Sequence, residues 1–422
     1  MLRKTPFCLL LIFLLLAVTP ELRAYSVLTH QAMIDAAWEK NIVPVLEEKY
    51  PGASLAELKE AHAYAYGGAI MPDMGYYPLG SVFFTDLVHY VRTGDFTRNL
   101  IGEATTRNEL AFALGALAHY HGDIHGHKLA TNRSVPLVYP KSRKYFGQVV
   151  TYEEDPVAHM RMEFGFDVLQ AARGNYAPQA YRDFIGFKVA REVLERAFYK
   201  TYGLKLSQIF VYLPLAERVF RFAVKALLPQ ITKIGWQFVN DEVDDNEGVS
   251  ADQKVADLVR NGSFQKQYGN KQDEPGVSAR LMAAVLRFMP KVGLLETLKF
   301  ELPTAEAEKL FATSFDAALE NYISSLEKMP AELPELNDYD LDTGLPAHLG
   351  EYQLADRAFA RLLKKLADEE FETAPEPLRT EALQYFAGLP PPPDYRKEKK
   401  QYRKTKASLE LLEQLQKPAP GN

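Results

Sequence analysis

Five side chains that commonly bind metals stand at helical spacing in one short stretch of the chain. His119, Asp123 and His127 follow one another at intervals of four residues, and His159 and Glu163 repeat that interval. An α-helix turns once in about 3.6 residues, so side chains four apart lie on one helix face. Imidazole and carboxylate groups are zinc ligands, and five of them exceed the tetrahedral shell of one ion. The spacing predicts two helices facing a cluster of two or more zinc ions.

A single buried histidine is more often a hydrogen-bonded core residue than a metal ligand. The distribution of histidines argues against that alternative here. Eight of the nine histidines lie in the first 160 residues, and only His348 falls in the long remainder. Clustering and spacing together favour the metal centre.

Local signals place both helix starts. Thr106 is followed three residues later by Glu109, the pattern of a capping box. Asp155 and Pro156 have the residue types of an N-cap and a first helical position. One helix is therefore expected to begin after Thr106, and the other after Asp155.

The first 24 residues have the pattern of a secretory signal. Arg3 and Lys4 precede an apolar run of eleven residues at 8–18, and Ala24 ends a possible cleavage site. Eleven apolar residues are too few to span a membrane comfortably. We expect cleavage after Ala24, with an uncleaved anchor as the alternative. The mature protein would then begin at Tyr25 and be secreted or periplasmic.

Composition limits how the exported chain is stabilised and what it binds. The only cysteine, Cys8, lies inside the signal, so no disulfide is expected, and stability must come from core burial and metal. A formal net charge of −6 argues against general affinity for nucleic-acid backbones, and no stable nucleic-acid partner is expected. Nothing in the sequence indicates the oligomeric state.

The rest of the chain has helical periodicity without strand alternation, so the predicted fold class is all-α. The residues after Met71, including Asp73, are expected in a loop. Further helices are expected at 181–202, 206–243, 277–289, 304–328, 352–370 and 377–386.

An aromatic stripe at 209–228 is either core or a lipid contact. The predicted organisation is a signal at 1–24, a catalytic domain at 25–245, a helical region at 246–388, and a proline-rich linker with a basic tail at 389–422.

Four segments resemble the zinc-dependent phospholipase C/D family. This family includes bacterial phosphatidylcholine-hydrolysing phospholipases, the amino-terminal domain of glycosylphosphatidylinositol-specific phospholipase D, and single-strand nucleases of the S1/P1 type. The segments are Gly68–Asp73, Leu87–Tyr90, Ala113–His119 and His159–Glu163. The resemblance covers roughly residues 25–170 and implies a multi-helix bundle with a helical C-terminal extension.

The resemblance also implies three zinc sites, with Asp123 bridging two of them. The first would use Asp73, His89, His119 and Asp123; the second His127, His159 and Glu163; and the third His30, Asp123 and the amino and carbonyl groups of Tyr25. The family usually has tryptophan at the first mature position, where this chain has tyrosine. The change is tolerable because the backbone supplies the ligand atoms.

The expected activity is hydrolysis of a phosphodiester, most simply a phospholipid headgroup, with two to three zinc ions and possible peripheral contact with a membrane. Asp73 is the candidate to orient or deprotonate the attacking water. A single-strand nuclease is the first alternative, with Tyr76 and Tyr77 as a base-stacking slot. A non-catalytic zinc-binding protein is the second. The motifs His-Asp, His-Glu-x-x-His and Glu-x-x-His are absent from the sequence, which argues against the other metal chemistries considered.

Overall fold

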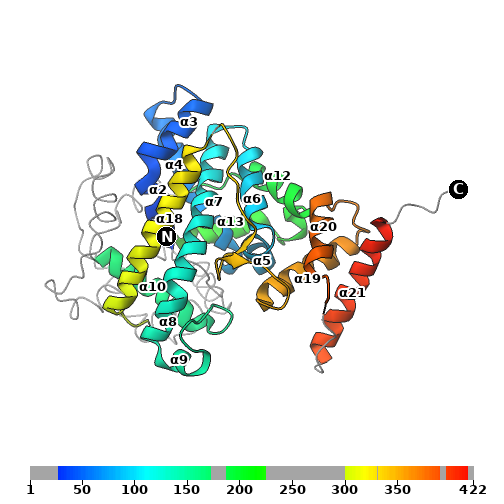
Figure 1. Cartoon of the computed structure of the whole chain (residues 1–422). Helices are drawn as coiled ribbons and strands as arrows, with labels where there is room; N and C mark the ends of the chain where they lie inside the picture. The colour runs from blue at the N-terminus through cyan, green and yellow to red at the C-terminus, as the bar shows by residue number, and fades with distance from the viewer. Residues whose placement is uncertain (1–26, 173–186, 225–299, 330, 390–395, 417–422) are drawn as a thin grey trace, which may run out of the picture.

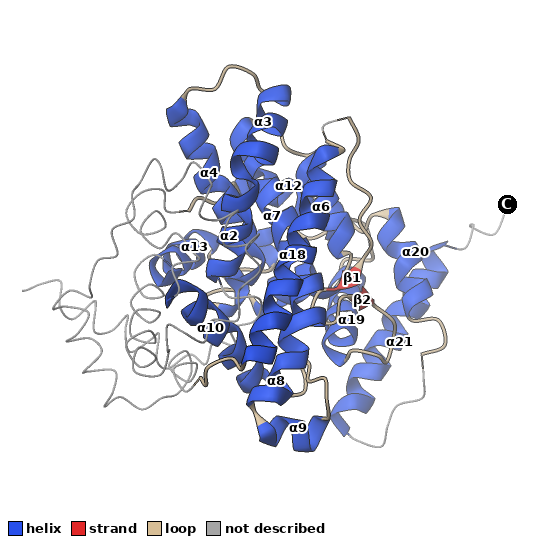
Figure 2. Cartoon of the chain, turned by 60° about the vertical axis from the view of Figure 1, so that its left-hand side comes forward, coloured by secondary structure: helices blue, strands red, loops and turns tan. Residues whose placement is uncertain are grey.

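Helices form nearly all of the regular structure in the computed structural model, which describes residues 27–172, 187–224, 300–329, 331–389 and 396–416 (Figures 1 and 2). The all-α expectation is confirmed for these residues. The signal segment, Tyr25 and the helix expected at 277–289 lie outside them.

The α-helices before residue 173 are α2 (Val27–Ala37), α3 (Val43–Lys49), α4 (Leu55–Ile70), α5 (Val82–Tyr90), α6 (Thr93–Gly102), α7 (Arg107–Gly126), α8 (Asn132–Val138), α9 (Pro140–Phe146) and α10 (Pro156–Ala172). Those that follow are α12 (Arg191–Tyr202), α13 (Leu213–Phe222), α18 (Ala305–Glu327), α19 (Gln353–Ala367), α20 (Glu376–Tyr385) and α21 (Arg396–Gln416). Short π-helices η1 (Trp38–Ile42) and η3 (His127–Thr131) and 3-10 helices η2 (Met71–Tyr76) and η5 (Leu206–Gln208) connect some of them.

Both predicted helix starts are confirmed. The Thr106 hydroxyl accepts a hydrogen bond from the Glu109 amide at 3.2 Å, and Asp155 Oδ1 accepts one from the Ala158 amide at 3.0 Å. The Glu109 carboxylate departs from a strict capping box, because it accepts from the amide and hydroxyl of Thr105 at 2.8 and 2.7 Å. The helices that carry the predicted ligands therefore begin where local sequence places them.

Helices α4 and α7 cross at the centre of the molecule with their backbones in close contact. A Cβ atom added to Gly68 would lie 1.8 Å from the carbonyl oxygen of Phe112, and one added to Gly115 would lie 2.0 Å from that of Ala65. Only glycine permits this approach at either position. The crossing holds the end of α4 beside the part of α7 that carries His119.

The segment expected as a loop after α4 is the 3-10 helix η2. Pro72 has no amide hydrogen, so the α-helical hydrogen-bond pattern cannot continue through it. The chain tightens into a 3-10 turn instead, and all six residues from Met71 to Tyr76 are buried. Asp73 is therefore held on a rigid, buried element.

The helix expected at 206–243 is interrupted within its described part. A 3-10 turn at Leu206–Gln208 is followed by non-helical residues, and α13 begins at Leu213. The aromatic stripe divides accordingly: Phe220 is fully buried, whereas Val211 is fully exposed. Among the described helices, none combines the length and the apolar character that a membrane crossing needs.

The region after residue 300 packs against the earlier helices. Helix α18 runs along α7 (Figure 2), and its Tyr322 hydroxyl donates a hydrogen bond to the Leu114 carbonyl oxygen at 3.0 Å. The helices expected at 304–328, 352–370 and 377–386 correspond to α18, α19 and α20. The proposed division at residue 245 stays a prediction, since residues 225–299 lie outside the described ranges.

A small antiparallel hairpin was not predicted. Strands β1 (Tyr339–Asp340) and β2 (Leu345–Pro346) have two residues each, too few to show an alternating pattern. Gly344, in the connecting turn, has a φ of +63°, a conformation that favours glycine. The hairpin places the chain after Tyr339 against α5, where the Leu341 amide donates to the His89 carbonyl oxygen at 3.0 Å.

Candidate metal centre

Asp73, His89, His119 and Asp123 meet between η2, α5 and α7, and all four are buried. His119 Nε2 lies 3.0 Å from Asp123 Oδ2 and 3.3 Å from His89 Nε2. His89 Nε2 also lies 3.3 Å from Asp73 Oδ1 and 3.5 Å from Asp123 Oδ2. Two nitrogen and two carboxylate oxygen atoms therefore surround one point.

The backbone fixes the tautomers of both histidines in this first group. His119 Nδ1 lies 3.0 Å from the Ala69 carbonyl oxygen, and His89 Nδ1 lies 2.9 Å from that of Thr85. A carbonyl oxygen can only accept a hydrogen bond, so each Nδ1 carries the hydrogen. In the neutral ring the Nε2 lone pair then points into the group, as a metal ligand requires.

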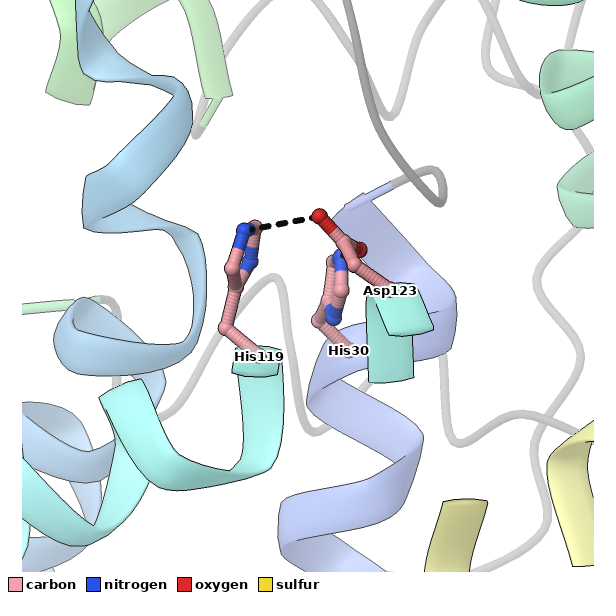
Figure 3. Close-up of side chains that lie close together, drawn as sticks. All are labelled: His30, His119 and Asp123. Atoms are coloured by element: carbon pink, nitrogen blue, oxygen red, sulfur yellow. Dashed lines mark ion pairs between the residues drawn. The ribbon is translucent and has the colours of Figure 1, made fainter. Parts of the chain in front are cut away.

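A second group joins the first through Asp123. His30, on α2, places its Nε2 atom 3.3 Å from Asp123 Oδ1, and its ring stacks on His119 with centroids 4.4 Å apart (Figure 3). The two carboxylate oxygens of Asp123 thus face different histidines. This is the bridging position that the resemblance implies for Asp123.

His127 belongs to a third group, which corresponds to the second zinc site that the resemblance implies, although His127 continues the four-residue spacing of His119 and Asp123. Helix α7 ends at Gly126 and the π-helix η3 begins at His127, whose amide still donates to the Asp123 carbonyl oxygen in the α-helical pattern. His127 Nε2 and His159 Nδ1 each lie 3.2 Å from Glu163 Oε1. His127 lies on η3, whereas His159 and Glu163 both lie on α10.

The atom spacing and the buried oxygens fit divalent metal. Ligand atoms about 2.0 Å from a tetrahedral zinc ion lie about 3.3 Å from one another. The nitrogen–oxygen separations in the three groups run from 3.0 to 3.5 Å. Asp73 Oδ1, both Asp123 carboxylate oxygens and Glu163 Oε1 accept no hydrogen bond from any group in the described ranges. A bound cation would satisfy these buried carboxylate oxygens.

The electrostatics of the centre also favour a positive charge among these carboxylates. Burial alone would lower the pKa of His89, but the Asp123 and Asp73 carboxylates outweigh it and raise that pKa to about 10. Burial opposes the ionised form of Asp123, yet His119 and His127 hold its pKa well below the usual range. The raised pKa of His89 favours a proton on that ring beside the two carboxylates, and metal binding must displace that proton.

Two residues beside the third group were missed by the sequence prediction. His127 Nδ1 lies 3.4 Å from Asp342 Oδ1, and His159 Nε2 lies 2.8 Å from Asn132 Oδ1. Asn132 follows His127 closely in the chain, but its side-chain type alone indicates no role. Asp342 lies far away in sequence, so no spacing rule could have found it.

A third missed residue anchors the helix that carries His30. Asp167 stands four residues after Glu163 on α10, and its carboxylate accepts hydrogen bonds from the Leu28 amide at 2.9 Å and the Thr29 hydroxyl at 2.8 Å. This satisfies the Leu28 amide in the first turn of α2. The spacing of His159, Glu163 and Asp167 at four-residue intervals was a signal that could have found it.

The two tyrosines suggested as a base-stacking slot are buried. Tyr77 packs its ring against Phe220 at a centroid distance of 4.6 Å, and the Tyr76 ring lies 6.1 Å from that of His89. Neither presents a free ring face at the surface. Tyr25 lies outside the described residues, so its predicted role as a ligand stays a prediction.

A predominantly helical protein with buried, convergent imidazole and carboxylate groups has the features of a helical metalloprotein. Residues 29–210 match the family model for zinc-dependent phospholipase C, which supports the resemblance noted in the sequence. Searches of curated proteins and of solved structures give no significant match. The matched segment contains every predicted ligand from His30 to Glu163, and Asp342 lies outside it.

Proposed function

We propose that the protein is an exported zinc-dependent phosphodiesterase that hydrolyses phospholipid headgroups and uses two to three zinc ions. The observation that carries the proposal is the position of Asp123, whose two oxygens face His30 on one side and His119 and His89 on the other. A carboxylate so placed can serve two adjacent metal sites. The match of residues 29–210 to the zinc-dependent phospholipase C model supports a phospholipid as the substrate.

The metal ligands have separate tasks in this proposal. Bound zinc would lower the pKa of a coordinated water and neutralise charge on the phosphate oxygens. Asp73 would orient the attacking water or accept its proton: its Oδ1 lies 3.3 Å from His89 Nε2, and burial raises its pKa above the usual range. His89 and His119 keep their Nε2 atoms fixed through their hydrogen bonds to backbone carbonyl oxygens.

The segment before α13 supports contact with a lipid surface. Val211 is fully exposed and Tyr212 is 61% exposed, although both are apolar or amphipathic. The same region packs against η2, which carries Asp73, through the contact between Phe220 and Tyr77. An exposed apolar site near the metal centre would suit an enzyme whose substrate lies in a membrane.

One assay tests the function directly. Zinc-loaded protein beginning at Tyr25 is incubated with phosphatidylcholine vesicles, phosphatidylinositol vesicles and single-stranded DNA. Release of a phosphorylated headgroup with diacylglycerol supports the proposal, and His119→Ala is the inactive control. Cleavage of DNA alone would favour the nuclease, and stable zinc binding without hydrolysis of any of them would favour a non-catalytic zinc protein.

Contact with the membrane is tested separately. Val211→Ser with Tyr212→Ser should reduce sedimentation with vesicles and hydrolysis of vesicle lipid. Hydrolysis of a short-chain phospholipid below its micelle concentration should stay unchanged. Equal loss on both substrates would contradict a role for this segment in lipid contact.

A further inference from the structure

Asp342 brings the C-terminal region into contact with the metal centre of the family domain. It lies in the turn between β1 and β2, outside the segment that matches the family model, and its side chain is fully buried. A charged residue is rarely buried so completely unless other groups satisfy it. Its contacts therefore indicate what it does.

Both histidines of the third group turn their outer nitrogen toward this turn. His127 directs Nε2 toward Glu163 and Nδ1 toward Asp342 Oδ1, at 3.2 and 3.4 Å. The second histidine, His159, reaches the same turn through Asn132. The Asn132 side chain receives the His159 Nε2 contact at 2.8 Å and donates its amide hydrogen to the Asp342 carbonyl oxygen at 2.7 Å. The turn between β1 and β2 therefore contacts the His127 ring directly and the His159 ring through Asn132.

The Asp342 carboxylate is held in place independently of the histidines. Its Oδ2 atom accepts hydrogen bonds from the hydroxyls of Tyr90 at 2.8 Å and Tyr352 at 2.5 Å. Its backbone amide donates to Asp340 Oδ1 at 2.8 Å. These bonds come from α5, from the residue that precedes α19, and from the hairpin itself. The Oδ1 atom is therefore presented to His127 by a preformed support.

We propose that Asp342 is a positioning residue for the zinc site formed by His127, His159 and Glu163. Its Oδ1 atom accepts the hydrogen of His127 Nδ1 and thereby leaves the Nε2 lone pair directed toward Glu163. The distance of 3.4 Å is slightly longer than the usual N–H···O range of about 2.7–3.2 Å, so a small rotation of the ring completes the bond. Carboxylates behind a ligating histidine fix its orientation and increase its basicity.

The proposal rests on the metal centre of the proposed function, but not on its substrate. It also assigns a task to the region after residue 300, because the hairpin that carries Asp342 completes a site whose ligands lie before residue 170. Helices α18 and α19 flank this hairpin in sequence and both pack on the family domain. The family domain alone would therefore hold this zinc ion less tightly.

Zinc binding to the full chain beginning at Tyr25 tests the proposal. Asp342→Asn keeps the shape of the side chain and removes its charge, and Asp342→Ala also removes the acceptor. Asp356→Asn is the matched control: its carboxylate, in the same region, accepts from the Tyr385 hydroxyl at 2.7 Å and from the Gly350 amide. Zinc affinities come from competition with a chromogenic chelator, and the absorption spectrum of the Co²⁺-substituted protein reports the ligand geometry.

We expect Asp342→Asn to weaken the binding of one zinc ion by about 10- to 100-fold, with Asp342→Ala weaker still and Asp356→Asn unchanged. The total number of ions at saturating zinc should stay that of the wild type. Wild-type affinity and an unchanged cobalt spectrum in Asp342→Asn would overturn the proposal. Loss of a whole ion at saturation would also overturn it, since Asp342 would then be a ligand itself.

Two further outcomes separate this inference from the proposed function. A wild-type protein that binds zinc but hydrolyses no phospholipid refutes only the function, and the affinity comparison still decides the role of Asp342. A wild-type protein that binds no zinc overturns both. If Asp342→Ala fails to fold, as circular dichroism would show, Asp342→Asn alone supplies the decisive comparison.

Discussion

The Nε2 atoms of His89 and His119 lie 3.3 Å apart, while the Nδ1 atom of each ring contacts a backbone carbonyl oxygen. Two nitrogen lone pairs are thus directed at one point in the protein interior. Without a cation between them, one ring must take up a proton or the two lone pairs repel. The Asp123 carboxylate, which faces both rings, makes a positive charge at this point favourable. The structure around α5 and α7 is therefore expected to depend on metal.

Removal of zinc should lower the melting temperature of the protein. A ligand present at about 1000 times its Kd stabilises the folded state by about 4 kcal/mol, and no disulfide is expected to compensate for its loss. We expect a decrease of about 10 °C on chelation, measured by differential scanning calorimetry, with recovery on adding zinc. A chelator that abolishes activity but leaves the melting curve unchanged would show that the metals are catalytic only.

His119→Ala should reduce phosphodiesterase activity by more than about 100-fold, because even the outer partners of metal ligands cost 10- to 100-fold when removed. Asp123→Asn should cost most, since this residue would serve two ions. His348→Ala is the control, because His348 is exposed. Elemental analysis of each variant checks the cause: the first two should lose zinc, and the third should keep it. One zinc ion or none in the gently purified wild type would contradict the cluster.

Signal removal should add a zinc ligand. Cleavage after Ala24 would free an α-amino group with a pKa near about 8, and this amine and its own carbonyl can chelate zinc. An amide nitrogen offers no such lone pair. Protein made with a retained methionine before Tyr25 should bind about one zinc fewer and turn over more slowly than the processed form. Equal zinc content and turnover would show that the N-terminus is not a ligand.

Gly115→Ala should destabilise the fold by about 2–3 kcal/mol, because the new methyl group would meet the Ala65 carbonyl oxygen at the crossing of α4 and α7. His119 stands one turn further along α7, so its zinc affinity should also fall. Urea unfolding measures the first effect. Gly102→Ala is the control: its Cβ would find only the Leu333 side chain, at 3.7 Å. Equal stability in the two variants would mean that α4 and α7 can move apart without lowering the free energy of unfolding.

Stability should fall with rising pH because of Glu381. Burial, and after it the Asp338 carboxylate, raises the pKa of Glu381 to about 7, although Arg92 Nε lies 3.1 Å from it. Between its ordinary value of 4.5 and about 7, the folded protein keeps a proton that the unfolded chain releases. This contribution to stability is present at low pH and lost as the pH rises through 7.

Glu381→Gln mimics the protonated side chain and should remove that dependence. We expect the variant to melt a few degrees above the wild type at pH 8 and to match it near pH 4.5. Melting curves at both pH values, recorded at equal zinc content, provide the measurement. A constant difference between the two proteins across this range would contradict the raised pKa.

Features that depend on nearby residues were predictable from the sequence. The starts of α7 and α10 follow from Thr106 and Asp155, since a cap acts on amides only two or three residues away. The fold class follows from helical periodicity. The four-residue spacing also predicted that His119 and Asp123 would meet, because one straight helix carries both.

Residue spacing could not show which groups share a site; the resemblance implied a grouping, and the tertiary structure brings those side chains together and adds their supporting contacts. His127 shares the four-residue spacing of His119 and Asp123, yet its side chain contacts Glu163 on α10 and Asp342 in the hairpin. Asp342 reaches His127 only because α18 packs along α7 and returns the chain as a hairpin beside α5. Contacts of this kind depend on the packing of whole helices, not on any local pattern. The sequence by itself therefore determined the helices and the ligand types, and the packing of the fold determined how those ligands are brought together and which residues support them.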